Sequence, residues 1–135
     1  MAEIVINDGG SSAASDALVS QSGEYTVPMS SVVGQLVHIT GDKTASIADS
    51  SGIATAPADA LILAKPAAVT ATLLFAGKAG VLSGLTPGDA YFLGPSGSVV
   101  KSAALPTTAG SVVQHVGYAA DADTLVFFPH QPVVL

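Results

Sequence analysis

The segment SVVQHVGYAADADTLVFF, residues 111–128, gives the strongest indication of the fold class. Its two ends, Ser111–Ala119 and Thr124–Phe128, are rich in β-branched and aromatic residues, and the short segment Ala120–Asp123 between them is typical of a turn. Two such runs separated by a short polar connection predict a β-hairpin. The hairpin therefore indicates an all-β fold, and the rest of the chain is consistent with it.

Further strands follow from the same signals. They are predicted at Gln35–Thr40, Ala45–Ala48, Val69–Phe75, Ala90–Leu93 and Ser98–Lys101, with tight turns at Gly41–Lys43 and Gly94–Gly97. Taken together, the strands predict a small β-barrel or sandwich-like module of short antiparallel strands over residues 31–135. An extended N-terminal arm is predicted at residues 1–30, because residues 7–23 consist mostly of turn formers, Ser and Ala.

One segment, Pro57–Pro66, leaves two alternatives open. Pro57 suits the first position of a short helix. The apolar run Ala60–Ala64 equally suits a buried strand, because five apolar residues have no readable period. We favour the strand.

Length and composition limit the classes of protein to which the chain can belong. The 135 residues suffice for one domain. There is no cysteine, so the chain forms no disulfide and no thiolate metal site. The start, Met1–Gly10, has no basic region typical of a secretory signal. No apolar run reaches the roughly 20 residues that span a bilayer.

The charge of the chain limits the classes of partner that we expect it to bind. Four Lys and no Arg stand against ten carboxylates, for a formal net charge of −6. Such a chain repels nucleic acid and anionic lipid, so we expect neither nucleic acid nor a membrane as partner. Only 10% of the residues are charged while 49% are hydrophobic. Little charge is then available to cover a wet surface, which favours permanent contact with other subunits.

Two predicted strands are apolar on both faces, because successive side chains point to opposite sides of a sheet. They contain Leu73–Phe75 and Leu125–Phe128. The second face packs either against another layer of the same domain or against another subunit. For the second alternative, the candidate subunit-interface residues are Leu74, Phe127 and Phe128.

Motifs for catalysis and metal binding are missing from the sequence. His38, His115 and His130 lack the spacing of metal ligands, and we interpret them as polar surface or interface residues. Asp121 and Asp123 form a D-x-D pair, which we attribute to turn formation rather than to calcium. We therefore predict no enzyme, no catalytic residue, no cofactor and no metal.

Four segments together resemble a module of tailed-bacteriophage structural proteins. They are GLTPGDAYFL (84–93), GPSG (94–97), LPTTAGSVVQHVGYA (105–119) and DTLVFF (123–128), with a matching lead-in from residue 33. The module occurs in capsid decoration (cement) proteins, head fibres and tail-fibre segments. Because this chain has no shaft or coiled-coil segment, the resemblance favours a free-standing decoration protein.

The resemblance implies a function and partners. A decoration protein of this kind sits on the capsid exterior of the virion, commonly as a homotrimer, after synthesis in the host cytoplasm, and it stabilises the lattice of the major capsid protein. Its terminal arm commonly binds the capsid, which makes Ile4, Val5 and Ile6 the candidate capsid-binding residues. Two other roles stay open: a tail-fibre, head-fibre or baseplate accessory module, and a glycan-binding receptor module.

Overall fold

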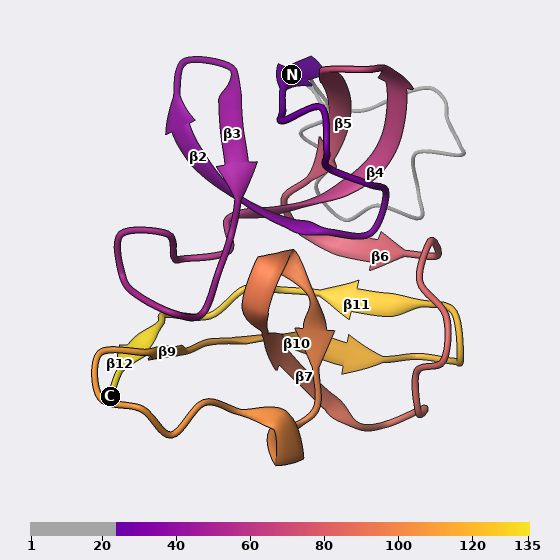
Figure 1. Ribbon diagram of the computed structural model, residues 1–135. Helices are drawn as coiled ribbons and strands as arrows, with labels where there is room; N and C mark the ends of the chain where they lie inside the picture. Colours follow the sequence, from indigo (N-terminus) through magenta and orange to yellow (C-terminus); the bar gives the residue numbers. More distant parts are fainter. Residues whose placement is uncertain (1–23) are drawn as a thin grey trace, which may run out of the picture.

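The computed structural model describes residues 24–135 and consists of short strands joined by turns (Figure 1). This confirms the all-β class. The strands are β1 (Glu24–Thr26), β2 (Leu36–Gly41), β3 (Thr44–Ile47), β4 (Ala60–Ala67), β5 (Thr70–Leu74), β6 (Gly77–Ala79), β7 (Ala90–Leu93), β8 (Val99–Val100), β9 (Val112–Val113), β10 (His115–Ala119), β11 (Leu125–Phe127) and β12 (Val133–Val134). Short 3-10 turns lie at Pro95–Gly97 and Ser102–Ala104. Among the described residues, no helix has the length and apolarity to cross a membrane.

The N-terminal sheet has the strand order β1-β3-β2-β4-β5 and returns to β1, which pairs with both β3 and β5. All its pairs are antiparallel except β1 with β3, which meet in parallel at Thr26 and Thr44. The sheet surrounds a core of small and β-branched side chains. The fully buried members of that core are Val37, Ala60, Ile62, Ala71 and Leu73.

The C-terminal sheet has the order β6-β11-β10-β7-β8, and β9 pairs with β12 in a separate two-stranded sheet. A larger core lies between the N-terminal and C-terminal sheets, which form the upper and lower halves of Figure 1. Both halves contribute to it: Leu36, Leu61 and Leu74 from above, and Tyr91, Leu93, Val116, Leu125 and Phe127 from below.

The two cores explain the strands that are apolar on both faces. Leu73 points into the core of the N-terminal sheet, and Leu74 points into the core shared with the C-terminal sheet. The second face of β5 thus packs against another layer of the same domain.

The predicted interface role of Leu74 and Phe127 is wrong, because both side chains are 0% exposed within the chain. Phe128 differs: it follows the end of β11, alternates to the opposite side and is 60% exposed.

Segment 57–66 forms the favoured strand, since β4 runs over Ala60–Ala67 and pairs with β2 and β5. The boundary of the arm needs correction. Glu24–Thr26 forms β1 and Val27 is buried, so these residues belong to the folded body and not to an arm ending at residue 30. Tertiary pairing decides this, because a three-residue strand carries too little pattern to be read locally.

The residues of the GLTPGDAYFL motif (84–93) have structural roles in the segment Leu85–Tyr91. Asp89 N donates to Thr86 O (3.1 Å), and Gly88 has φ +86°. This geometry suits Pro87 at the second turn position and Gly at the third. Tyr91 then enters the core, and its hydroxyl accepts a hydrogen bond from Thr86 N (2.8 Å). These motif residues therefore stabilise the fold.

Candidate functional site: the outer face of the C-terminal sheet

The inner side of the C-terminal sheet packs into the core shared with the N-terminal sheet, and its outer side is a surface of the molecule. Directly opposite residues of neighbouring strands share a face of a sheet. The register places Val126 of β11 beside Lys78 of β6 and beside Tyr118 of β10, and Tyr118 beside Ala90 of β7. These four residues form one outward row across the sheet, with Lys78 at its edge.

A second row consists of aromatic rings. Phe92 of β7 pairs in register with His115 of β10, and their rings meet edge to face at a centroid distance of 5.3 Å. His130 packs against His115 at 4.6 Å, and Phe128 packs against His130 at 6.0 Å. We call Phe92, His115, Tyr118, Phe128 and His130 the aromatic face.

The aromatic face is open to solvent and nearly free of charge. Phe128 and Tyr118 are 60% and 51% exposed. Burial is the main cause that lowers the pKa of His115, and the neighbouring His130 lowers it further, so the His115 imidazole is neutral near pH 7. Asp89, which directly precedes β7, has a carboxylate oxygen 3.4 Å from Lys101 Nζ.

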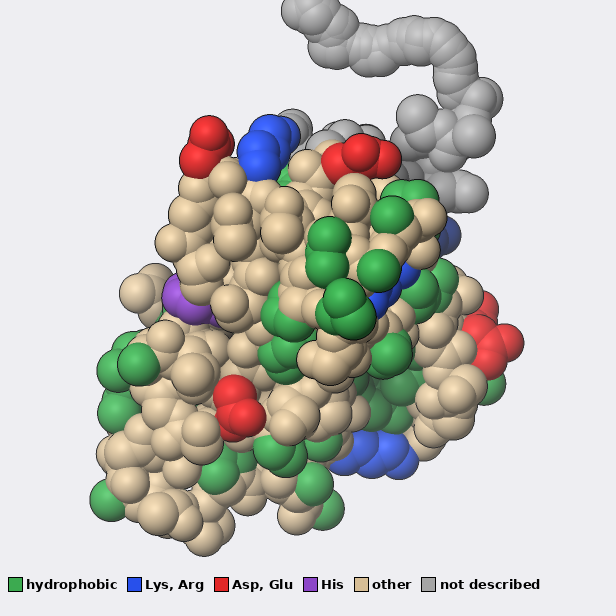
Figure 2. All heavy atoms as spheres, turned by 45° about the horizontal axis from the view of Figure 1, so that its top comes forward, with side chains coloured by type: hydrophobic (Ala, Val, Ile, Leu, Met, Phe, Trp, Pro, Cys, Tyr) green, Lys and Arg blue, Asp and Glu red, His purple; other side chains and the backbone are tan. Residues whose placement is uncertain are grey.

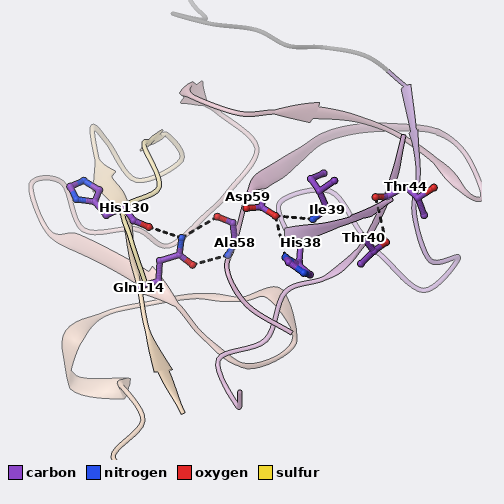
Figure 3. Close-up of polar contacts among 8 residues, drawn as sticks. All are labelled: His38, Ile39, Thr40, Thr44, Ala58, Asp59, Gln114 and His130. Atoms are coloured by element: carbon purple, nitrogen blue, oxygen red, sulfur yellow. Dashed lines mark hydrogen bonds and ion pairs between the residues drawn. The ribbon is translucent and has the colours of Figure 1, made fainter. Parts of the chain in front are cut away.

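A buried amide holds the base of this face in place. Gln114 is 1% exposed, and its side chain accepts from Ala58 N (2.7 Å) and donates to Ala58 O (3.1 Å) and His130 O (2.9 Å) (Figure 3). It therefore fixes the segment that carries His130 against the segment that leads into β4. A shallow cleft of about 370 Å³ lies along this junction, lined by Pro57, Gln114, Pro129, His130 and Pro132 among others.

A second exposed apolar surface lies on the loop between β1 and β2. Met29 is 71% exposed, Val32 56% and Val33 41%, and Gly34 lies against Leu82, next to the exposed Val81. We call Met29, Val32, Val33 and Val81 the loop patch. Figure 2 shows hydrophobic side chains gathered in the middle of the face it draws, with a basic side chain among them and other charged side chains toward the margin.

Hydrogen bonds hold this loop in one conformation. Lys65 Nζ donates to Met29 O (2.9 Å) and Ser31 O (2.6 Å), Ser31 Oγ donates to Pro28 O (2.6 Å), and Val32 N donates to Gln35 Oε1 (2.7 Å). The exposure of Met29 and Val32 is therefore a fixed property of the fold.

The remaining polar residues singled out from the sequence have structural roles. His38 Nδ1 lies 3.1 Å from Asp59 Oδ2, which also accepts from Ile39 N (2.8 Å) and so ties the start of β4 to β2 (Figure 3). Asp121 Oδ1 accepts from Asp123 N and Thr124 N at 2.9 Å, as expected for a carboxylate that shapes a hairpin turn. In residues 24–135, no three His, Cys, Asp or Glu side chains gather as a metal site.

The outcome for the other predicted sites is mixed. Ile4, Val5 and Ile6 lie outside the described residues. Phe128 is exposed and remains available for a partner. The sequence analysis did not predict the contact of His115 with His130. The sequence carries only a weak signal for this contact, because the two residues lie on opposite arms of a hairpin.

Comparison of the sequence with protein-family models and with curated proteins, and of the structure with solved structures, found no match.

Proposed function

We propose that the protein is a non-enzymatic structural subunit of a tailed-bacteriophage virion. It decorates the capsid exterior as a homotrimer and stabilises the lattice of the major capsid protein. The first support is the resemblance of residues 33–128 to the phage module. Several motif residues have clear tasks in the fold, among them the turn at Pro87 and Gly88, the buried Tyr91 and the Gln114 amide.

The observation that carries the proposal is the loop patch. Protein interfaces gain most from apolar side chains that are ordered before binding, because little conformational freedom is then lost on association. Met29 and Val32 project from a loop that the side chains of Ser31, Gln35 and Lys65 hold in place. The chain also has few charges to keep such a surface permanently wet. If another protein chain covers the loop patch, both the ordered exposure of Met29 and Val32 and the low charge of the chain are accounted for.

The loop patch also lies close to the junction with residues 1–23, since it begins three residues after β1. In the proposed arrangement, the arm with Ile4–Ile6 adds to a sheet edge of the major capsid protein. Three weak contacts made by one trimer reinforce each other through effective concentration. The alternative role, an accessory module of fibre or baseplate, requires binding to tails instead of heads.

The test uses purified DNA-filled heads that lack outer proteins. We expect the wild-type protein to run as a trimer in light scattering and to raise the temperature at which the heads release DNA. Deletion of residues 2–22 should leave the trimer and its melting temperature intact while abolishing the protection. A protein that is monomeric at micromolar concentration, or that protects no heads, contradicts the proposal. Binding to isolated tails alone favours the accessory-module role.

A further inference from the structure

We propose that the aromatic face binds a neutral polysaccharide. This inference does not depend on the role in the capsid, because it concerns a surface of the isolated subunit. The face joins Phe92, His115, Tyr118, Phe128 and His130 on one side of a sheet. Its chemistry is that of a sugar-binding platform: rings for stacking, polar edges for hydroxyl groups, and no carboxylate on the strands beneath it.

The rings provide the stacking surface. A sugar ring presents C–H groups on its faces, and these pack against the electron-rich faces of aromatic side chains. Phe128 and Tyr118 are the most exposed Phe and Tyr residues of the described chain, at 60% and 51%. The series from Phe92 through His115 and His130 to Phe128 extends over three consecutive ring contacts of 5.3, 4.6 and 6.0 Å. A surface of this shape suits several linked sugars better than a single one.

Two polar side chains of the face are free to bind hydroxyls. The Tyr118 hydroxyl and the ring nitrogens of His130 make no hydrogen bond to any residue in 24–135. A phenol both donates and accepts hydrogen bonds, as sugar hydroxyls do, and an imidazole ring offers two nitrogens for hydrogen bonding. A second copy of this protein packed on the face would bury these groups and would have to supply partners for them. A polysaccharide supplies hydroxyls along its whole length.

The few charges on the aromatic face and the negative net charge of the chain favour an uncharged ligand. The outward row contains one ionic group, Lys78 at its edge, and His115 is neutral near pH 7 because burial lowers its pKa. The chain as a whole carries a formal charge of −6, so its field repels acidic polysaccharides as it repels nucleic acid. Stacking and hydrogen bonding are therefore left as the binding forces.

The experiment is an NMR titration of the isotopically labelled, full-length protein. The probes are six-sugar malto-, cello- and manno-oligosaccharides, with oligogalacturonate as the acidic comparison. We expect at least one neutral probe to shift the resonances of Tyr118, Phe128 and His130 at millimolar concentration. Its affinity should not change between low and high salt, because no ion pair contributes. Oligogalacturonate should bind more weakly.

Variants locate the site. Phe128→Ala removes an exposed ring and should weaken binding by about tenfold, the size of one stacking contact. Tyr118→Phe keeps the ring and removes only the hydroxyl, so it should weaken binding by less. The matched control is Ile53→Ala, because Ile53 is an exposed apolar residue outside both the aromatic face and the loop patch, and it should leave sugar binding unchanged.

Three results overturn the proposal. The first is that no neutral probe shifts the aromatic face. The second is that oligogalacturonate binds best and does so in a salt-dependent way. The third is that Phe128→Ala lowers the oligomer mass in light scattering, which would make a second copy the occupant. Loss of head protection with intact sugar binding would count against the capsid role alone.

Discussion

The side chain of Gln114 pairs with both backbone polar groups of Ala58, 56 residues earlier in the chain, in the manner of one rung of a β-ladder. The same amide donates its second hydrogen to His130 O. One buried side chain thus joins three segments, and no aliphatic residue of similar size reproduces this. The pairing gives the first prediction.

Replacing Gln114 by Leu should lower the free energy of unfolding by about 3 kcal/mol, because Ala58 N and O are left buried without partners. The measurement is a urea denaturation curve. Gln131→Ala is the matched control, since Gln131 is exposed, and it should change stability by less than about 0.5 kcal/mol. Equal effects of the two substitutions would show that the Gln114 amide does not hold the segments together.

Phe127 and Phe128 form a neighbouring pair with opposite environments. Phe127→Ala should cost about 3–5 kcal/mol of unfolding free energy, the range for deleting a buried ring. Phe128→Ala should cost less than about 1 kcal/mol, because its ring is mostly in solvent. Denaturation midpoints of the two variants test the assignment. A reversed order would mean that β11 turns its other side to the core.

Gly117 lies where two strands approach closely. A Cβ at this position would collide with Val126 O, and the local φ of +156° is rare for other residues. Gly117→Ala should therefore destabilise the protein by about 3 kcal/mol or more, through displacement of β10 from β11. Gly52→Ala serves as control and should be tolerated, since a Cβ on Gly52 would meet nothing within 4 Å. The readout is the melting temperature of both variants, and similar melting temperatures would contradict the close approach.

Asp49 predicts a component of acid sensitivity. Burial tends to raise its pKa, but hydrogen bonds from Ser51 N and Ser96 N outweigh this and hold the pKa below its ordinary value. A lowered folded-state pKa stabilises the fold above the unfolded-state pKa, and that contribution is lost as the pH falls through the folded value.

The wild-type protein should then lose more stability below about pH 4 than Asp49→Asn does. Melting temperatures between neutral and acidic pH measure the difference. Asp42→Asn is a suitable comparison, because the Asp42 carboxylate accepts no hydrogen bond from residues 24–135. If Asp49→Asn shows the same acid loss as the wild type, the loop between β3 and β4 is held by other contacts.

Local pattern predicts the central elements of the fold well. The 111–128 hairpin, the Ala90–Leu93 strand and the turn at Pro87 and Gly88 all form where β-branched runs and turn residues indicate them. The strand at β4 is also correctly favoured over a helix. These signals are local, so a single sequence suffices to read them.

Tertiary contacts account for the errors. Strands β1, β6 and β12 are two or three residues long and exist because neighbours pair with them. The division into two cores, which buries Leu74 and Phe127, depends on how two sheets stack. The aromatic face needs both the β-bulge between His115 and Gly117 and the return of the chain at His130. Sequence spacing carries none of this information.

The most direct test of the capsid role is the number of copies bound to undecorated heads. Labelled wild-type protein is mixed with heads that lack outer proteins, and the bound copies are counted after sedimentation. We expect saturation at a fixed copy number divisible by three, with loss of binding when Met29 and Val32 are both replaced by Ser. Absence of saturable binding by the folded wild-type protein would contradict the capsid role.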